Sequence, residues 1–298
     1  PQMTGLGGDA FILFRPAGED RLVGINGSGR APRALSADHL REQGCDAIPT
    51  RSAHAVTVPG AVSAFALFLE DWGRLGLADA LAPAIRYAEE GIPVAPRVAL
   101  DWGQFAQNLQ GAARTHFLLD GRAPEAGDPF RWPRQAEALK LIAKEGARAF
   151  YEGAIMEDMV ESLRAHGGLH DADDFAACAP DYVEPISGRY RDVEIVELPP
   201  NGQGCVALLM AKLLEGFEIG RLDPLGPMRA HLEAEAAKIA YDARNRHLAD
   251  PHAMTGGIES ILGADRVAKL AALIDPQKAI PDIRRAAGGV HKETVYLT

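Results

Sequence analysis

Hydrophobic and polar residues recur with two different periods along the chain, and these periods predict its strands and helices. Residues 9–14 form a short apolar run after a glycine-rich stretch, and residues 21–25 follow across a polar turn. Two such runs joined by a turn predict a β-hairpin. Residues 62–69 and 77–91 instead repeat their apolar side chains with a helical period, and each segment is closed by a glycine. They predict two helices.

The middle of the chain continues with the helical period. It recurs in residues 135–151 and again in residues 155–168. Gly146 and Gly167 stand where helices commonly end, because glycine adopts the backbone conformation of a helix C-terminus without strain. We therefore expect the middle of the chain to be helical.

The last third of the chain mixes both periods. Residues 190–200 alternate apolar and polar side chains and end in two prolines, which predicts a half-buried strand. Residues 204–217 are apolar on most faces and predict a buried helix packed on that strand. Residues 228–251 predict a longer amphipathic helix whose Ala, Ile and Tyr side chains face the core and whose charges face water. Strands at both ends with helices between them predict layered α and β structure, not a barrel.

Composition and charge narrow the classes of function. With 298 residues and 47% hydrophobic content, the chain can bury a large core as one domain or two smaller ones. The net charge of -10, from 41 acidic and 31 basic residues, opposes binding to nucleic acid or to anionic lipid. No apolar run approaches the roughly 18 residues of a membrane span. The first five residues resemble neither a signal peptide nor an ordinary translation start, so we expect further residues upstream.

The cysteines are few and widely separated. Cys45, Cys178 and Cys205 form no CxxC pair, so we expect buried thiols rather than a disulfide or a zinc site. Unpaired cysteines fit a reducing compartment, which favours the cytoplasm slightly over the periplasm.

Histidine spacing does not predict a metal site. His166 and His170 are four residues apart, but two glycines between them interrupt the helix that would aim both rings at one ion. His247 and His252 are separated by Pro251, which would also end a helix. A dinucleotide loop is not predicted either, because the close glycines at residues 5–8 precede a strand instead of following one. We expect neither metal nor cofactor.

The order of several segments resembles one enzyme family, the γ-glutamyltransferases. The match covers nearly every residue, and a collinear series is specific where each segment alone is weak. The matching segments are residues 1–14, 56–65, 72–94, 127–153, 188–204 and 231–251. In this order they resemble most of the family's large subunit.

The resemblance implies an α+β fold of the N-terminal nucleophile (Ntn) hydrolase type, a four-layer αββα sandwich. Members are made as one precursor that cuts itself before a threonine, and that threonine begins the small subunit. Residues 293–298, ETVYLT, resemble this start. The resemblance therefore places the cleaved bond at Glu293-Thr294. Residues 1–293 would be the large-subunit part of a single domain without its N-terminal region of about 50 residues, and residues 294–298 the first strand of the small subunit.

By the same resemblance, Thr294 is the nucleophile. A hydroxyl needs a neighbouring base, and a chain-terminal threonine carries one in its own α-amino group, with an ordinary pKa of about 8. Before cleavage that nitrogen is an amide, so cleavage would activate the enzyme. Val295 and Tyr296 depart from the family's usual second threonine and following histidine. A threonine placed only for strand formation is the alternative.

A second departure concerns the substrate. Typical members carry an arginine a few residues before an Ala-Pro pair, where it binds the α-carboxylate of the γ-glutamyl group. Aligning Ala31-Pro32 places Ser28 at that position and Arg30 directly before the alanine. Because a bidentate arginine-carboxylate contact depends on geometry, Arg30 is either a shifted substrate ligand or an ordinary structural arginine.

The sequence therefore predicts a γ-glutamyltransferase-like amide hydrolase or acyl transferase that acts through an acyl-threonine intermediate on γ-glutamyl compounds such as glutathione. One alternative is an acylase for glutaryl or other acyl amides. Another is an unprocessed, non-catalytic relative with a binding or structural role. The expected partners are a small-molecule amide and the small subunit of the same precursor, and a homo-oligomer is compatible with these features.

Overall fold

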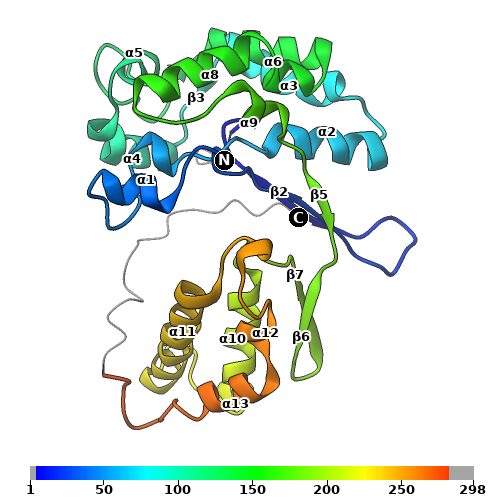
Figure 1. Ribbon diagram of the computed structural model, residues 1–298, viewed down its shortest axis with the longest axis vertical. Helices are drawn as coiled ribbons and strands as arrows, with labels where there is room; N and C mark the ends of the chain where they lie inside the picture. The colour runs from blue at the N-terminus through cyan, green and yellow to red at the C-terminus, as the bar shows by residue number, and fades with distance from the viewer. Residues whose placement is uncertain (1–4, 282–298) are drawn as a thin grey trace. The chain divides into compact units, whose positions relative to one another are not determined.

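The structure of the chain is a computed structural model that describes residues 5–281. These residues divide into two units (Figure 1). The first unit contains the residues up to Asp9 and the segment Gly29–Ala179. The second unit contains Ala10–Ser28 and the residues from Pro180 onward. The boundary between Ser28 and Gly29 falls inside the loop that carries the two predicted substrate-binding residues.

The first unit is mostly helical. Its helices α3 and α6 lie side by side (Figure 1). They end at Gly91 and Gly146, which have φ values of +89° and +79° that favour glycine. The predicted helices are confirmed, although the segment 135–151 forms two helices because the chain turns at Gly146. The helices are α1 (Ala37–Glu42), α2 (Ala61–Trp72), α3 (Leu77–Glu90), α4 (Pro96–Phe105), α5 (Ala112–Phe117), α6 (Pro133–Glu145), α7 (Arg148–Tyr151), α8 (Ala154–Ala165) and α9 (Ala172–Ala176).

A short pair of strands and a hydrophobic cluster complete this unit. Strands β3 (Ile92–Pro93) and β4 (Pro129–Phe130) pair antiparallel. The cluster joins α2, α6, α7, α8 and α9. Its buried members are Val58, Val62, Ile142, Phe150, Tyr151, Met156 and Phe175.

The second unit begins with the predicted hairpin, which is confirmed. Strands β1 (Ala10–Phe14) and β2 (Val23–Gly27) pair antiparallel, with Ala10 opposite Gly27. Strand β5 (Asp181–Val183) adds to the other edge of β2, so the sheet order is β1-β2-β5. The N-terminal hairpin is thus completed by a strand from far along the sequence.

The expected single strand at residues 190–200 is wrong in its bounds, because a hairpin occupies this region. Strand β6 (Ile186–Tyr190) pairs with β7 (Val193–Glu197) across a turn in which Arg191 has a φ of +57°. A non-glycine residue in this conformation is uncommon, so the residue types at this position did not predict a turn. The two prolines follow β7, as expected.

Helices pack against this hairpin to form the core of the second unit. Helix α10 (Gly204–Leu214) contacts β6, β7 and α11 (Pro227–His247), and α12 (Glu259–Leu262) and α13 (Ala264–Ala271) complete the helical layer (Figure 1). The predicted burial of α10 is confirmed. The fully buried core residues include Cys205, Leu209, Leu213, Ala236, Ala240 and Ile261.

The expectation that every charge of the long helix α11 faces water is wrong for Glu235, whose side chain is 2% exposed. Its carboxylate lies 2.5 Å from Lys238 Nζ and accepts a hydrogen bond from the Ile280 N–H at 2.9 Å. Burial alone would raise the pKa of Glu235, but the bonds from Lys238 and Ile280 outweigh it and lower the pKa. These partners allow the charge to remain inside.

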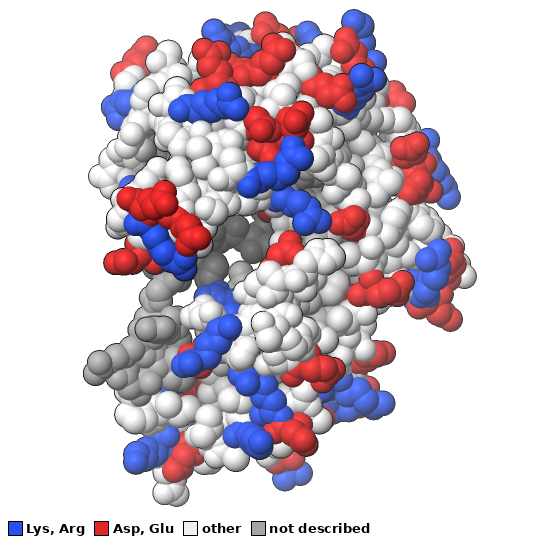
Figure 2. Space-filling model, in the orientation of Figure 1, with Lys and Arg blue, Asp and Glu red and all other residues white. Residues whose placement is uncertain are grey.

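Charged side chains are mixed over the surface. On the face that Figure 2 shows, acidic and basic groups of the described residues are interspersed, and neither sign forms a continuous patch there. Within residues 5–281, every helix is too short or too polar to cross a lipid bilayer. All three cysteines are free thiols, but only Cys205 is fully buried, whereas Cys45 and Cys178 are partly exposed.

Candidate active site

The loop that follows β2 carries Arg30 in the first unit, and its backbone is held from two sides. The Gly29 N–H donates to Asp9 Oδ1 at 2.9 Å, and the Arg30 carbonyl oxygen accepts from the Val58 N–H at 2.9 Å. A Cβ atom at position 29 would lie 1.4 Å from the Val58 carbonyl oxygen, so only glycine fits. Arg30 itself is exposed. The fold therefore fixes the backbone from which this side chain extends.

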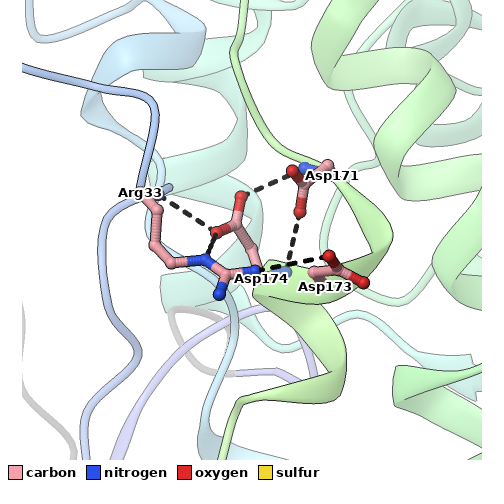
Figure 3. Close-up of polar contacts among 4 residues, drawn as sticks. All are labelled: Arg33, Asp171, Asp173 and Asp174. Atoms are coloured by element: carbon pink, nitrogen blue, oxygen red, sulfur yellow. Dashed lines mark hydrogen bonds and ion pairs between the residues drawn. The ribbon is translucent and has the colours of Figure 1, made fainter.

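The far end of the same loop is anchored at Arg33 (Figure 3). Asp174 Oδ1 accepts from the Arg33 N–H at 3.0 Å and from Arg33 Nε at 3.3 Å. Asp174 Oδ2 accepts from the Asp171 N–H, and Asp171 Oδ1 in turn accepts from the Asp174 N–H, which forms a capping box on α9. The helix start and the loop therefore share one carboxylate.

The ionisation of Asp174 follows from these partners. Its burial alone would raise the pKa, but the N–H groups of Arg33 and Asp171 and the Arg33 guanidinium outweigh that effect and lower it. Asp173 adds a longer, exposed ion pair to Arg33 at 3.7 Å (Figure 3). Asp174 is therefore an anionic anchor for the loop at neutral pH.

The segment that pairs with Arg30 is itself held by two buried side chains. Tyr151 Oη donates to the Pro59 carbonyl oxygen at 2.7 Å and accepts from the Ser63 N–H at 3.1 Å. His170 Nε2 donates to the Val56 carbonyl oxygen at 2.9 Å. Burial raises the pKa of Tyr151 to about 12, so its hydroxyl remains a donor at neutral pH. Residues 56–59 thus form a hydrogen-bonded support for the Arg30 backbone.

Cys178 lies beside this support. Its Sγ is 3.7 Å from the Pro59 carbonyl oxygen, and burial raises the pKa of the thiol. The nearby Asp9 carboxylate raises the same pKa further, whereas the nearby Arg30 guanidinium lowers it. The charges of Asp9 and Arg30, both in the first unit, therefore act on the Cys178 thiol in opposite directions.

Ser28 ends the segment of the second unit that contains β2. It is partly buried, its N–H donates to Asn26 Oδ1 at 2.9 Å, and its hydroxyl oxygen accepts from Asn201 Nδ2 at 2.8 Å. Ser28 is thus bound to a loop far away in sequence.

The predicted nucleophile and cleavage position, Thr294 and Glu293, lie outside the described residues and remain predictions. The histidines of the two spaced pairs make separate contacts. His166 bonds to the Ser162 carbonyl oxygen and His170 to that of Val56, while His247 accepts from Arg266. Within the part of the chain that the structure describes, no group of three or more His, Cys, Asp or Glu side chains could hold a metal ion.

Sequence reasoning missed most of the residues that support the loop. Asp9, Tyr151, Asp174 and Asn201 belong to segments whose local pattern indicates only a strand, a helix or a loop. Asp171 and Asp174 were the one available signal, because Asp is a preferred N-cap residue and acidic residues are favoured in the first turn of a helix. It indicates the helix but not the bond to Arg33.

Comparisons with known proteins agree on one family. The model of the γ-glutamyltranspeptidase family matches residues 1–298. The chain is 34% identical over 302 residues to the glutathione hydrolase-like YwrD proenzyme of Bacillus subtilis. This match covers 99% of the chain and 56% of that protein. The chain spans about half the length of the curated relatives it matches.

Solved structures add the fold. The crystal structure of the Helicobacter pylori γ-glutamyltranspeptidase superposes with a TM-score of 0.85 at 23% identity, over 99% of this chain and 87% of that one. Cephalosporin acylase from Bacillus halodurans superposes with a TM-score of 0.81 at 35% identity, over 91% of this chain and 52% of that one. The predicted α+β fold of the Ntn hydrolases is confirmed, and the chain supplies its large-subunit part. By sequence and by fold, the chain belongs to the γ-glutamyltranspeptidase family.

Proposed function

We propose that the chain is the large-subunit part of a self-cleaving amide hydrolase or acyl transferase that acts on γ-glutamyl compounds such as glutathione. The observation that carries this proposal is the family match over residues 1–298, which extends through Glu293 and Thr294. Relatives of which this chain spans about half are named proenzymes, which supports processing of a longer precursor. Residues 1–293 would then form the large-subunit part, and Thr294 would begin the small subunit.

The proposed chemistry starts at the new chain end, which supplies both the nucleophile and its base. After cleavage, the α-amino group of Thr294 takes the hydroxyl proton while the hydroxyl oxygen attacks the substrate carbonyl carbon. The amide C–N bond breaks, the leaving amine takes a proton, and the acyl group stays on the threonine as an ester. Water or an acceptor amine then attacks this ester, and the threonine hydroxyl is restored with a proton from the attacking group.

Arg30 is the proposed ligand of the carboxylate at the far end of the acyl group. The support is its anchored backbone, held through Asp9 and Val58 on either side, together with its exposure. Because the backbone is already fixed, only the arginine side chain has to be ordered when the guanidinium binds an anion, which lowers the entropic cost of the contact.

The small subunit of the same precursor is the proposed partner. Strand β1 is apolar at all five positions, a pattern typical of strands that are covered on both faces. Yet its Phe11 and Leu13 are 44% and 36% exposed in the described chain. A further layer supplied by the small subunit would cover these side chains.

A second candidate is an acylase for glutaryl or other acyl amides. Ser28 favours an acylase for acyl groups without a far-end carboxylate, because a serine at the arginine position removes the charge that binds this carboxylate in typical members. The 35% identity to a structure named cephalosporin acylase favours it independently.

Self-cleavage tests the first proposal. Full-length precursor, purified and incubated, should give two chains on a denaturing gel, the smaller beginning at Thr294. Thr294→Ala should remain one chain, whereas the control Thr298→Ala should still be cut. Cleavage at another bond would refute Thr294. An unmodified protein that stays whole and hydrolyses no amide would instead support the non-catalytic alternative.

Three p-nitroanilides separate the enzymatic candidates. The γ-glutamyl compound carries a carboxylate and an amine, the glutaryl compound only the carboxylate, and the valeryl compound neither. Arg30→Ala should lower kcat/KM for the γ-glutamyl and glutaryl compounds about tenfold to a hundredfold, which corresponds to the loss of one charge-assisted hydrogen bond. The value for the valeryl compound should not change. Arg41→Ala, an exposed arginine of the same unit, is the control. A strong preference of the unmodified enzyme for glutaryl or valeryl compounds would favour the acylase.

A further inference from the structure

The sheet of the second unit brings Asn26 to a distant loop. Gly24 and Asn26 lie two residues apart on β2 and so point to the same face. A Cβ atom on Gly24 would lie 2.6 Å from the Leu198 side chain, so the missing side chain makes room for Leu198. Residues 198–202 therefore cross this face, and Asn201 comes within hydrogen-bond distance of Asn26.

Three hydrogen bonds close a ring at this point. Asn26 Nδ2 donates to Asn201 Oδ1 at 2.9 Å, Asn201 Nδ2 donates to the Ser28 hydroxyl oxygen at 2.8 Å, and the Ser28 N–H donates to Asn26 Oδ1 at 2.9 Å. Each amide is used at both ends. Turning the Asn201 amide over would place two donors against each other at Asn26, so the ring fixes its orientation.

The ring also fixes the role of the Ser28 hydroxyl. A hydroxyl has one proton to donate and two lone pairs to accept with. Because Asn201 presents an N–H, Ser28 accepts from it, and no bond of the ring uses the Ser28 proton. That proton is therefore directed out of the ring, as a neutral donor.

We infer that Asn201 is a specificity-determining residue that acts through Ser28: it keeps the Ser28 proton available to the carboxylate at the far end of a glutaryl or γ-glutamyl acyl group. The inference rests on the proposed function and adds a position that the family resemblance did not supply. Asn201 is a positioning residue here, because the contact with the substrate is made by Ser28.

A double-mutant cycle in the full-length enzyme tests this role. Asn201→Ala should lower kcat/KM about tenfold for glutaryl-p-nitroanilide, mainly through KM, and leave valeryl-p-nitroanilide unchanged. Ser28→Ala should do the same. In the Ser28→Ala enzyme, Asn201→Ala should have no further effect, because a residue that acts through another loses its effect when that other is absent.

A substitution by a residue of similar shape reverses the direction of the hydrogen bond between residue 201 and Ser28. It also provides a test if Asn201→Ala does not fold. Asn201→Asp replaces the N–H by an oxygen, so the Ser28 proton turns toward Asp and is lost to the substrate. Glutaryl turnover should fall at least as far as in Asn201→Ala. The control Gln203→Glu places the same charge in the same loop, where Arg244 already contacts the side chain at 2.8 Å, and should have little effect.

The outcomes separate the two proposals. Equal losses on glutaryl and valeryl compounds, or an Asn201→Ala effect that adds to Ser28→Ala, would overturn the inference and leave the amide hydrolase standing. Equal effects of Asn201→Asp and Gln203→Glu would also overturn it. An unmodified enzyme that hydrolyses none of the three amides would overturn the proposed function and the inference together.

Discussion

The carboxylate of Asp174, whose side chain is 3% exposed, binds both the backbone N–H and the guanidinium of Arg33, 141 residues earlier in the chain. One buried anion therefore joins the loop after β2 to the first turn of α9. The loop that carries Arg30 is fixed at its far end by this contact, since Arg33 lies three residues beyond Arg30.

Replacing Asp174 should test the strength of this anchor. Asp174→Asn should lower the free energy of unfolding by about 1–3 kcal/mol, because an amide offers one acceptor oxygen where three N–H groups are now bound. Urea unfolding measures the change. The control Asp173→Asn should have little effect, because that side chain is 85% exposed.

The same pair gives a pH dependence. Since the pKa of Asp174 is lowered in the folded chain, its contribution to stability is complete above the unfolded pKa of about 4. The contribution is lost as the pH falls through the folded pKa. When the pH is lowered from about 5, the free energy of unfolding of Asp174→Asn should therefore decline less than that of the unmodified chain. Parallel declines would contradict the assignment.

Gly29→Ala should damage the fold at the Arg30 loop. A methyl group there would overlap the Val58 carbonyl oxygen, a backbone atom that cannot rotate away. We expect a loss of about 3 kcal/mol in unfolding free energy, at the upper end of overpacking costs. Gly103→Ala is the matched control, because no atom lies near the new methyl and alanine favours the α4 helix. Equal stability of the two variants would refute the close approach.

Tyr151→Phe should loosen the support behind Arg30. It leaves the Pro59 carbonyl oxygen and the Ser63 N–H without their buried partner, which costs about 1–3 kcal/mol. Because burial raises the pKa of Tyr151 to about 12, its contribution is full below the unfolded pKa of about 10 and is lost as the pH rises toward 12. Thermal unfolding at alkaline pH should show a shallower decline in the variant. Tyr87→Phe, at a site 49% exposed, should not change it.

Glu235→Gln should weaken the attachment of Ile280 to α11. The amide loses the charge that Lys238 now meets, and we expect a loss of about 1–3 kcal/mol in unfolding free energy at neutral pH. With the pKa of Glu235 lowered, this difference should shrink as the pH falls through the folded value. Glu233→Gln, which removes a 43% exposed ion-pair partner of Arg229, should change stability by less than about 1 kcal/mol.

The helices were predictable because their periodicity is local. Residues 62–69, 77–91 and 155–168 each show which side faces the core without knowledge of any other segment. The hairpin β6–β7 was not, because its turn has neither glycine nor proline and places Arg191 at a positive φ. The buried Glu235 was missed for a related reason, since its partner Ile280 lies 45 residues away.

The site divides in the same way. Arg30 and Ser28 could be selected because the family resemblance aligns their segment on Ala31-Pro32. Asn201 and Asp174 could not, because their partners at Ser28 and Arg33 are 173 and 141 residues away and no local pattern relates them. Long-range hydrogen bonds arise only once the sheet and helices have brought the segments together.

The anchoring of the loop has a consequence for chimaeras between family members. A loop transplanted onto residues 29–33 would have to keep glycine at position 29, where the Val58 carbonyl oxygen leaves no room for a methyl group. It would also need a cation at position 33 to match Asp174. A donor sequence without either residue would destabilise the loop, so an exchange of this loop has to include the residues that support it.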